Sequence, residues 1–268
     1  MEKVFEKPKF AATMMAAVPY RDMERAGDVI LKNFPEAPCL PVMTRGIKWM
    51  LEGIPCVVID RKNRRILLDP SPERESELLE FYDRYIEEDL DYFATTPETA
   101  PFFYGMLERL KRSRPPELKW VIITAMNEGF VGLTCLTWIH CCANIDWSLL
   151  TDSTVDVINF DAYQHADKAV LYVEEFKRFL ERGGMIGWGI VPVIDVLLSG
   201  ETVSGLVDRL QEGIDLFVSK GIDEELLASS SWVLPSCETV LLTNEQSDVA
   251  LNMTKEISEV MRGRYGWT

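Results

Sequence analysis

Residues 155–192 read VDVINFDAYQHADKAVLYVEEFKRFLERGGMIGWGIVP, and this stretch decides the fold class. The apolar run VDVINFD precedes an amphipathic stretch (165–182), the pair Gly183-Gly184 and a second apolar run, MIGWGIVP. Short apolar runs that alternate with amphipathic helices are typical of parallel βα units. A glycine pair fits a helix C-terminus that turns into the next strand. We therefore expect a parallel β–α–β unit here.

The same rhythm continues on both sides of this unit. Further apolar runs lie at 134–142 and 231–235, and further amphipathic stretches lie at 202–219 and 244–262. A chain of 268 residues can bury a full core as one large domain. We expect one α/β domain over residues 1–268, with a TIM-like (β/α) barrel as its architecture.

The N-terminal half departs from this rhythm. Its predicted elements are, in chain order, a strand at 10–18, a helix at 22–33, a short helix at 44–53, a hairpin of strands at 56–60 and 65–69, an acidic helix at 73–91 and a helix at 97–112. Residues 118–133 stay open, because VIIT indicates a strand whereas AMNEGF indicates a helix end. We therefore expect an N-terminal β-hairpin and a helical insertion beside the barrel.

Charge and hydropathy exclude several kinds of partner. The 43 acidic and 28 basic residues give a formal net charge of −15. Such a chain repels nucleic acid and anionic membranes, which are bound by clustered Lys and Arg. No apolar stretch reaches the roughly 20 residues that cross a bilayer, and the first residues lack the apolar run of a signal peptide. We expect a cytoplasmic protein that binds neither nucleic acid nor membrane.

The segment TWIHCCANIDW (137–147) is the most informative, because one of the two histidines lies there beside two of the six cysteines. On a strand, His140 and Cys142 point to the same face, and Cys141 points to the opposite face. Imidazole and thiolate groups placed in this way can bind one tetrahedral metal ion. Cys237, just past the apolar run WVLP, is a third candidate ligand because the ends of barrel strands converge.

A zinc ion is the metal that this set of residues favours. Asp161 ends the run VINFD and is predicted as a fourth ligand or as a partner of a ligand. Three ligands and an open position are typical of catalytic zinc sites, and such an ion lowers the pKa of an incoming thiol. No HExxH-type helix supplies a general base for hydrolysis. The pattern therefore favours transfer of an alkyl group to sulfur.

The remaining cysteines and the second histidine are given structural roles. In a reducing compartment, six cysteines in a chain of this size do not form a disulfide framework. Cys39, Cys56 and Cys135 are expected to be buried small side chains. His165 opens an amphipathic stretch and is expected at the surface or as a helix cap.

The sequence resembles the catalytic barrel of cobalamin-independent methionine synthases and their shorter relatives. That superfamily also includes uroporphyrinogen decarboxylases and zinc corrinoid methyltransferases. A weaker match covers residues 18–43, and the main resembling segments are IHCCANIDWSLL (139–150), VDVINFDAY (155–163), FLERGGMIGWGIVPV (179–193) and LPSCETVLL (234–242).

The resemblance implies a zinc ion that is bound by His140, Cys142 and Cys237. Asp161 falls at the acidic position, where methionine synthases have glutamate. A homocysteine-like thiol is the implied substrate, and the implied methyl donor is a methyl-folate or a methylated corrinoid protein. The polar residues assigned to substrate binding are Asn144, Asp146, Tyr20 and Glu238.

Three departures from the family bear on its activity. The family's Gly-Ser-x-Pro, whose serine helps to hold the amino-acid carboxylate, aligns with AAVP at residues 16–19. The Asp-Glu-Pro that anchors the substrate amine has no counterpart between Lys119 and His140, where one or two βα units are missing. Glu238 replaces a glycine beside a metal ligand.

Two hypotheses of different classes follow. The leading hypothesis is a zinc-dependent methyltransferase-like protein that activates a thiol. The alternative is a catalytically impaired zinc-binding protein that serves as an accessory or regulatory subunit of a methyltransferase system. A shortened barrel exposes strand edges that a second copy in a homo-oligomer, or a partner, could cover. Porphyrinogen decarboxylation is disfavoured, because the sequence shows no basic cluster near the predicted strand ends.

Overall fold

A computed structural model of the chain describes residues 5–15, 17–40, 57–60, 65–69, 71–87, 89, 101–123, 136–143 and 145–267. The expected helix at 44–53 lies outside these residues, as do 124–133, Cys56, Cys135 and Asn144.

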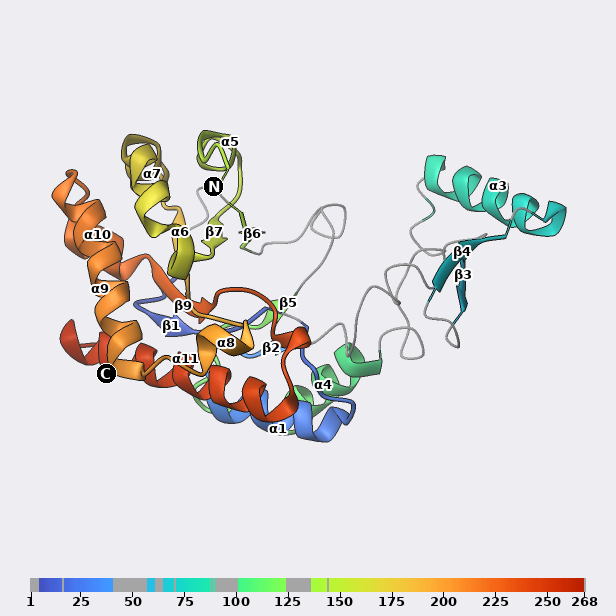
Figure 1. Cartoon of the computed structure of the whole chain (residues 1–268), viewed down its shortest axis with the longest axis horizontal. Helices are drawn as coiled ribbons and strands as arrows, with labels where there is room; N and C mark the ends of the chain where they lie inside the picture. The colour runs from blue at the N-terminus through green and yellow to red at the C-terminus, as the bar shows by residue number, and fades with distance from the viewer. Residues whose placement is uncertain are drawn as a thin grey trace.

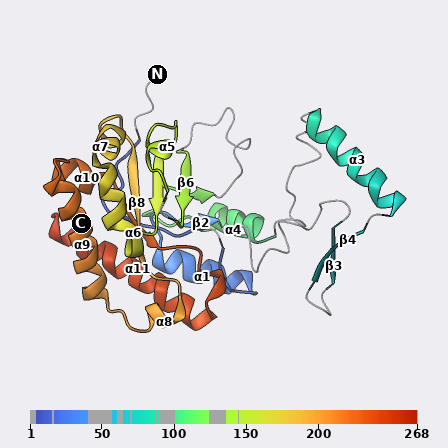
Figure 2. The ribbon, with the colours of Figure 1, turned by 45° about the horizontal axis from the view of Figure 1, so that its top comes forward.

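A five-stranded parallel sheet forms the centre of the described fold (Figures 1 and 2). Its strands have the order β1-β9-β8-β7-β6, so the first strand of the chain lies beside the last. The bounds of these strands are β1 Ala11–Ala12, β6 Trp138–Cys141, β7 Val157–Phe160, β8 Met185–Val191 and β9 Ser231–Pro235. The prediction of a mixed α/β fold with parallel βα units is confirmed.

Two further pairs of strands accompany the central sheet. β2 (Cys39–Leu40) pairs in parallel with β5 (Ile122–Ile123). β3 (Val57–Asp60) and β4 (Arg65–Leu68) form the expected antiparallel hairpin.

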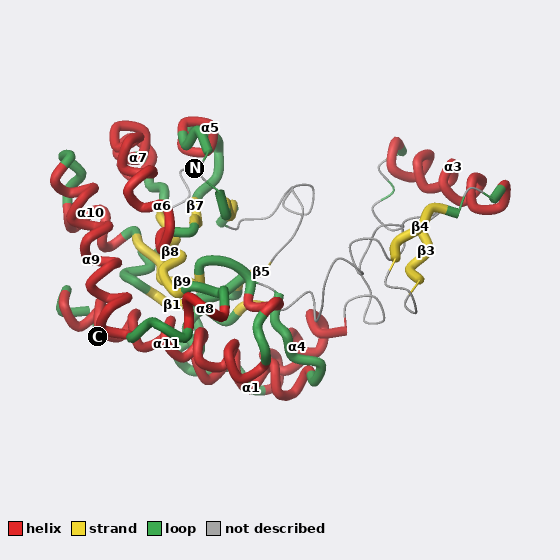
Figure 3. The backbone as a smooth tube through the Cα atoms, in the orientation of Figure 1, coloured by secondary structure: helices red, strands yellow, loops and turns green. Residues whose placement is uncertain are grey.

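Helices pack against the strands of the central sheet (Figure 3). α3 and the β3–β4 hairpin lie apart from that sheet in Figures 1 and 2. Within the described part of the chain, no helix combines the length and the apolar character needed to cross a membrane. The helices are α1 Met23–Asn33, α3 Pro72–Ile86, α4 Pro101–Arg112, α5 Ser148–Thr151, α6 Ala162–Ala169, η2 Val170–Tyr172, α7 Val173–Glu181, α8 Asp195–Leu198, α9 Val203–Ser219, α10 Glu224–Ser229, η3 Thr239–Leu241 and α11 Asn244–Arg264.

The expected glycine turn after residues 165–182 is present. Gly183 has a φ of 97°, a left-handed conformation that glycine adopts without a Cβ clash. Its N–H donates to the Leu180 carbonyl at 2.9 Å, and the Gly184 N–H donates to the Phe179 carbonyl at 2.9 Å. These bonds end α7 and turn the chain into β8.

The predicted strand at 10–18 is shorter than expected, because only Ala11 and Ala12 pair with β9. Phe10 has a φ of 58°, which interrupts extended backbone immediately before the strand. After the strand, the Thr13 hydroxyl donates to the Ala37 carbonyl at 2.7 Å. An apolar run alone did not reveal this turn.

The main core packs the sheet against its helices through aromatic side chains. β7, β8 and β9 are buried along their whole lengths, as expected for parallel strands that are covered on both faces. Aromatic rings from two strands, two helices and the residue that caps α5 contact one another in the core: Phe160, Trp188, Phe176, Phe217 and Trp147. The sheet is therefore a rigid platform for residues at its carboxyl edge.

Candidate metal centre

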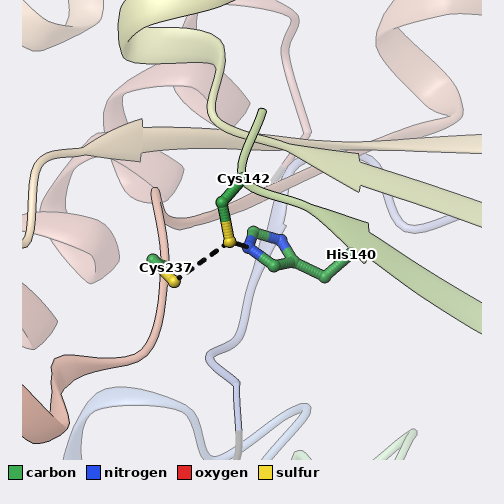
Figure 4. Close-up of side chains that lie close together, drawn as sticks. All are labelled: His140, Cys142 and Cys237. Carbon is green, nitrogen blue, oxygen red and sulfur yellow. Dashed lines mark hydrogen bonds between the residues drawn. The ribbon is translucent and has the colours of Figure 1, made fainter. Parts of the chain in front are cut away.

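Two strands bring the candidate ligands together at the carboxyl edge of the sheet (Figure 4). His140 lies in β6, and Cys142 directly follows that strand. Cys237 follows the end of β9. The strands run in parallel, so their carboxyl ends lie at the same edge, and residues 95 positions apart in the chain meet there.

The ligand atoms of His140, Cys142 and Cys237 form one compact group. His140 Nε2 lies 3.0 Å from Cys142 Sγ, which lies 3.5 Å from Cys237 Sγ. One ligand atom from each residue lies within 4.8 Å of the others. Among the residues that the structure describes, this is the only such group of three or more His, Cys, Asp or Glu side chains.

The donor set fits a zinc ion. Two thiolates on a tetrahedral zinc, with Zn–S distances of about 2.3 Å, lie about 3.8 Å apart. The sulfur atoms of Cys142 and Cys237 are already 3.5 Å apart, so this pair is within a few tenths of an ångström of that separation. One nitrogen and two sulfur ligands also match the soft-ligand preference of zinc.

Burial sets the protonation of the ligands. Burial lowers the pKa of His140, while its hydrogen bond to Asn159 and the charge of Asp161 act in the opposite direction. Partial desolvation, together with the neighbouring Cys237, raises the pKa of Cys142 to about 12. At neutral pH the imidazole is therefore neutral, and the Cys142 thiol keeps its proton until a cation displaces it.

The segment that carries Cys237 is held against β8 by the backbone. The Ser236 N–H donates to the Val191 carbonyl at 2.7 Å. A Cβ at Gly189 would lie 2.5 Å from the Phe160 carbonyl oxygen and 2.9 Å from Ser236 Cα. Both neighbours are backbone atoms, so Gly189 is the residue that lets this segment approach the sheet.

Asp161 is close to the centre but is engaged by α6. Its carboxylate accepts hydrogen bonds from the Gln164 backbone N–H at 3.0 Å and from Gln164 Nε2 at 2.7 Å. It is the N-cap of α6 and is buried. Asp161 lies outside the compact ligand group, and its role as a direct ligand stays a prediction.

The structure gives the predicted substrate residues different surroundings. The Asp146 carboxylate is exposed and accepts hydrogen bonds from the backbone and hydroxyl of Ser148. Tyr20 is fully buried, and its hydroxyl donates to Asp248 at 2.5 Å. Glu238 adjoins Cys237 in sequence and is half-buried, which raises its pKa. Among the described residues, no hydrogen bond joins these side chains to the ligand group.

The other described cysteines and His165 also have defined places. Cys39 is fully buried, as expected, and burial raises its pKa far above the usual range. Cys141 points away from the ligand group, and its thiol donates to the Ala143 carbonyl at 3.2 Å. His165 lies inside α6, so it does not cap the helix, which begins after the cap residue Asp161.

Sequence reasoning missed Asn159. This residue lies in β7, directly opposite His140 in the strand register, and is fully buried. Its Oδ1 lies 2.6 Å from His140 Nδ1, and its Nδ2 donates to the Gly187 carbonyl at 3.0 Å. The sequence offered one signal, because Asn159 is the single polar residue in the apolar run VINF. The strand that this run forms lies beside β6, which carries the candidate ligand His140.

Comparisons with known proteins show a slight structural likeness to a known enzyme. The sequence matches no protein-family profile and no curated protein. A B12-independent methionine synthase from Shewanella sp. W3-18-1, solved in complex with selenomethionine, is similar with a TM-score of 0.38 and 16% identity. The match covers 51% of this chain and 41% of that one, so this chain spans less than half of the length of that structure. The likeness is too slight to identify a family or an activity.

Proposed function

We propose that the chain binds one zinc ion through His140, Cys142 and Cys237 and activates a homocysteine-like thiol for methylation. The observation that carries this proposal is the convergence of one imidazole nitrogen and two thiol sulfurs within 4.8 Å at the carboxyl edge of a parallel sheet. Cys237 lies 95 residues further along the chain than Cys142. The fold, and not the local sequence, therefore brings the two thiols together.

Three protein ligands leave a coordination position for a substrate sulfur. Cys142 is exposed, and the other two ligands are half-buried, so an incoming small thiol has access from solvent. When bound, zinc would lower the pKa of that thiol and supply a thiolate nucleophile at neutral pH. The protein's part is to hold the neutral imidazole and the two cysteines at fixed strand ends.

Transfer of a methyl group to sulfur suits this site better than hydrolysis. A hydrolytic zinc site needs a general base beside the ion, and the nearby Asp161 carboxylate is occupied by Gln164. The sequence segments that resemble methionine synthases also support methyl transfer. The proposed donor is a methyl-folate or a methylated corrinoid protein.

A TIM-like barrel is the architecture we propose for residues 1–268 as one domain. The parallel pairing of β1 with β9 places the first and last strands side by side, as closure of a barrel requires. The separate parallel pair of β2 and β5 supplies strands that precede β6 in the chain. Active sites of such barrels lie at the carboxyl ends of the strands, where the ligand group is found.

A second candidate function is a catalytically impaired zinc-binding protein that serves as an accessory or regulatory subunit of a methyltransferase system. Ala17 and Val18 are buried and apolar in the segment where the resembling family has a carboxylate-binding serine. The Tyr20 hydroxyl, two residues later, is engaged by Asp248. This segment offers no free hydroxyl group for the carboxylate of an amino acid.

Cobalt-substituted protein separates the two candidates. If the leading proposal is right, addition of homocysteine increases the thiolate-to-cobalt charge-transfer absorption, and the zinc protein methylates homocysteine when given a methylated corrinoid or methyl-folate. Homoserine, which has a hydroxyl group in place of the thiol, serves as the control and leaves the spectrum unchanged. Bound cobalt with no response to any small thiol would contradict thiol activation and favour the accessory subunit.

A further inference from the structure

We propose that Asn159 and Gly187 are positioning residues that fix the tautomer and the orientation of His140, so that Nε2 is the metal-binding nitrogen. The metal-binding half of this inference rests on the proposed zinc site, whereas the tautomer half concerns the protein without metal. Three adjacent strands carry the arrangement, one residue each.

The three residues form one row across the sheet. His140 in β6 is the register partner of Asn159 in β7, and Asn159 is the register partner of Gly187 in β8. Register partners in neighbouring strands point to the same face. The row therefore leads from the interior of the sheet to the ligand group.

The carbonyl of Gly187 sets the orientation of the Asn159 amide. A carbonyl oxygen only accepts hydrogen bonds, so the amide NH₂ group must face it, and Nδ2 lies 3.0 Å from that oxygen. The amide oxygen is then directed to the other side, where it lies 2.6 Å from His140 Nδ1. Asn159 is fully buried, so water does not compete for either bond.

The Asn159 amide in turn sets the tautomer of His140. The amide oxygen can only accept, so Nδ1 must carry the proton. A neutral imidazole has one N–H group, which leaves a free lone pair on Nε2. It is Nε2 that lies 3.0 Å from Cys142 Sγ, inside the ligand group.

Gly187 is required because the row has no space for another side chain. A Cβ at this position would lie 2.8 Å from Asn159 Cβ, 3.1 Å from Asn159 Nδ2 and 3.1 Å from Leu234 Cδ1. The nearest of these atoms is held by the β7 backbone and cannot move aside. A side chain at 187 would push the amide away from His140.

The sequence makes a direct test possible, because the chain has only two histidines, His140 and His165. Long-range ¹H–¹⁵N correlation spectra of the metal-free, ¹⁵N-labelled protein distinguish the two tautomers of each ring. We expect the Nδ1–H tautomer for His140 in the wild type. In Asn159→Leu, which has a similar size but no acceptor, we expect the His140 signals to move toward the Nε2–H tautomer.

Two further variants separate positioning from folding. Ile158→Val changes a buried neighbour of Asn159 on the opposite face and should leave the tautomer unchanged. Gly187→Ala should shift the His140 signals in the same direction as Asn159→Leu, and it tests the row even if Asn159→Leu fails to fold. Zinc affinity should fall about 10–100-fold in Asn159→Leu.

The outcomes distinguish this inference from the proposed function. An Nε2–H tautomer in the wild type, or an unchanged tautomer in both Asn159→Leu and Gly187→Ala, would overturn the inference even if zinc binds. An Nδ1–H tautomer that is lost in both variants supports the positioning role, and absence of zinc binding would then count against the proposed function alone.

Discussion

Cys142 Sγ and Cys237 Sγ lie 3.5 Å apart at the carboxyl ends of β6 and β9, two strands that are not neighbours in the sheet. β7 and β8 lie between those strands. The chain segments after β6 and β9 must therefore bend toward each other over the edge of the sheet. For Cys237, this bend depends on the bond between Ser236 and Val191.

The first prediction concerns Gly189, which lets the Ser236–Cys237 segment approach the sheet. Gly189→Ala should destabilise the protein by about 1–3 kcal/mol through overpacking, because its Cβ would meet two backbone atoms. It should also weaken metal binding, because Cys237 is displaced. Thermal unfolding and a metal titration measure the two effects.

The matched control for Gly189→Ala is Gly263→Ala in α11. A Cβ there would meet no atom within 4 Å, and alanine in a helix is favoured over glycine by about 0.5–1 kcal/mol. The control should therefore be neutral or stabilising and should bind metal normally. Equal effects of the two substitutions would refute the account of Gly189.

Asp161 gives a second prediction, because capping and metal binding respond differently to substitution. Asn is as good an N-cap as Asp, whereas Ala loses about 1 kcal/mol of helix stability. If Asp161 acts mainly as the cap of α6, Asp161→Asn should keep both the stability and the zinc affinity of the wild type. Asp161→Ala should be less stable than the wild type. A chelator competition assay measures the zinc affinity of Asp161→Asn, and a large loss of affinity there would show that the carboxylate is a ligand.

The third prediction is that metal binding tightens as the pH rises. Burial lowers the pKa of His140, so this ring is neutral at neutral pH and costs no proton. The pKa of Cys142 is raised to about 12, so its thiol must release a proton when a metal binds. Each released proton makes the apparent affinity rise about tenfold per pH unit. Competition titrations between about pH 6 and 8 test this slope, and an affinity that does not change with pH would show that Cys142 is not a ligand.

A fourth prediction concerns the aromatic core beneath the site. Phe176 is fully buried, with its ring centroid 5.4 Å from that of Phe217 and 5.9 Å from that of Trp147. Phe176→Ala should therefore cost about 3–5 kcal/mol. Leu171→Ala removes a side chain that is 78% exposed and should cost less than about 0.5 kcal/mol. Denaturant unfolding of the two variants checks the difference, and similar losses would contradict the packing described.

The sequence was most informative about features that depend on residues close together in the chain. The rhythm of residues 155–192 predicted β7, α7 and β8, and the alternation of side chains on a strand predicted that His140 and Cys142 share a face. The turn at Gly183-Gly184 also followed from residue type alone, because glycine tolerates the positive φ found there.

The contacts between distant segments were less accessible. The hydrogen bond between Asn159 and His140 depends on the register of β6 against β7, which apolar periodicity does not specify. Likewise, the hydrogen bond from the Gln164 N–H to the Asp161 carboxylate depends on where α6 begins, and the sequence pattern defines helix ends poorly. The short β1 reflects a positive φ at Phe10, a residue type that rarely adopts it.

The central claim is most directly tested by the zinc content of purified protein after loading with zinc and removal of loosely bound metal. The account predicts about one zinc per chain in the wild type and in Cys141→Ser, a matched control whose thiol points away from the group. It predicts loss of most of that zinc in Cys142→Ser and in Cys237→Ser. A folded wild-type protein without zinc, or Cys142→Ser and Cys237→Ser proteins that retain as much zinc as the wild type, would contradict it.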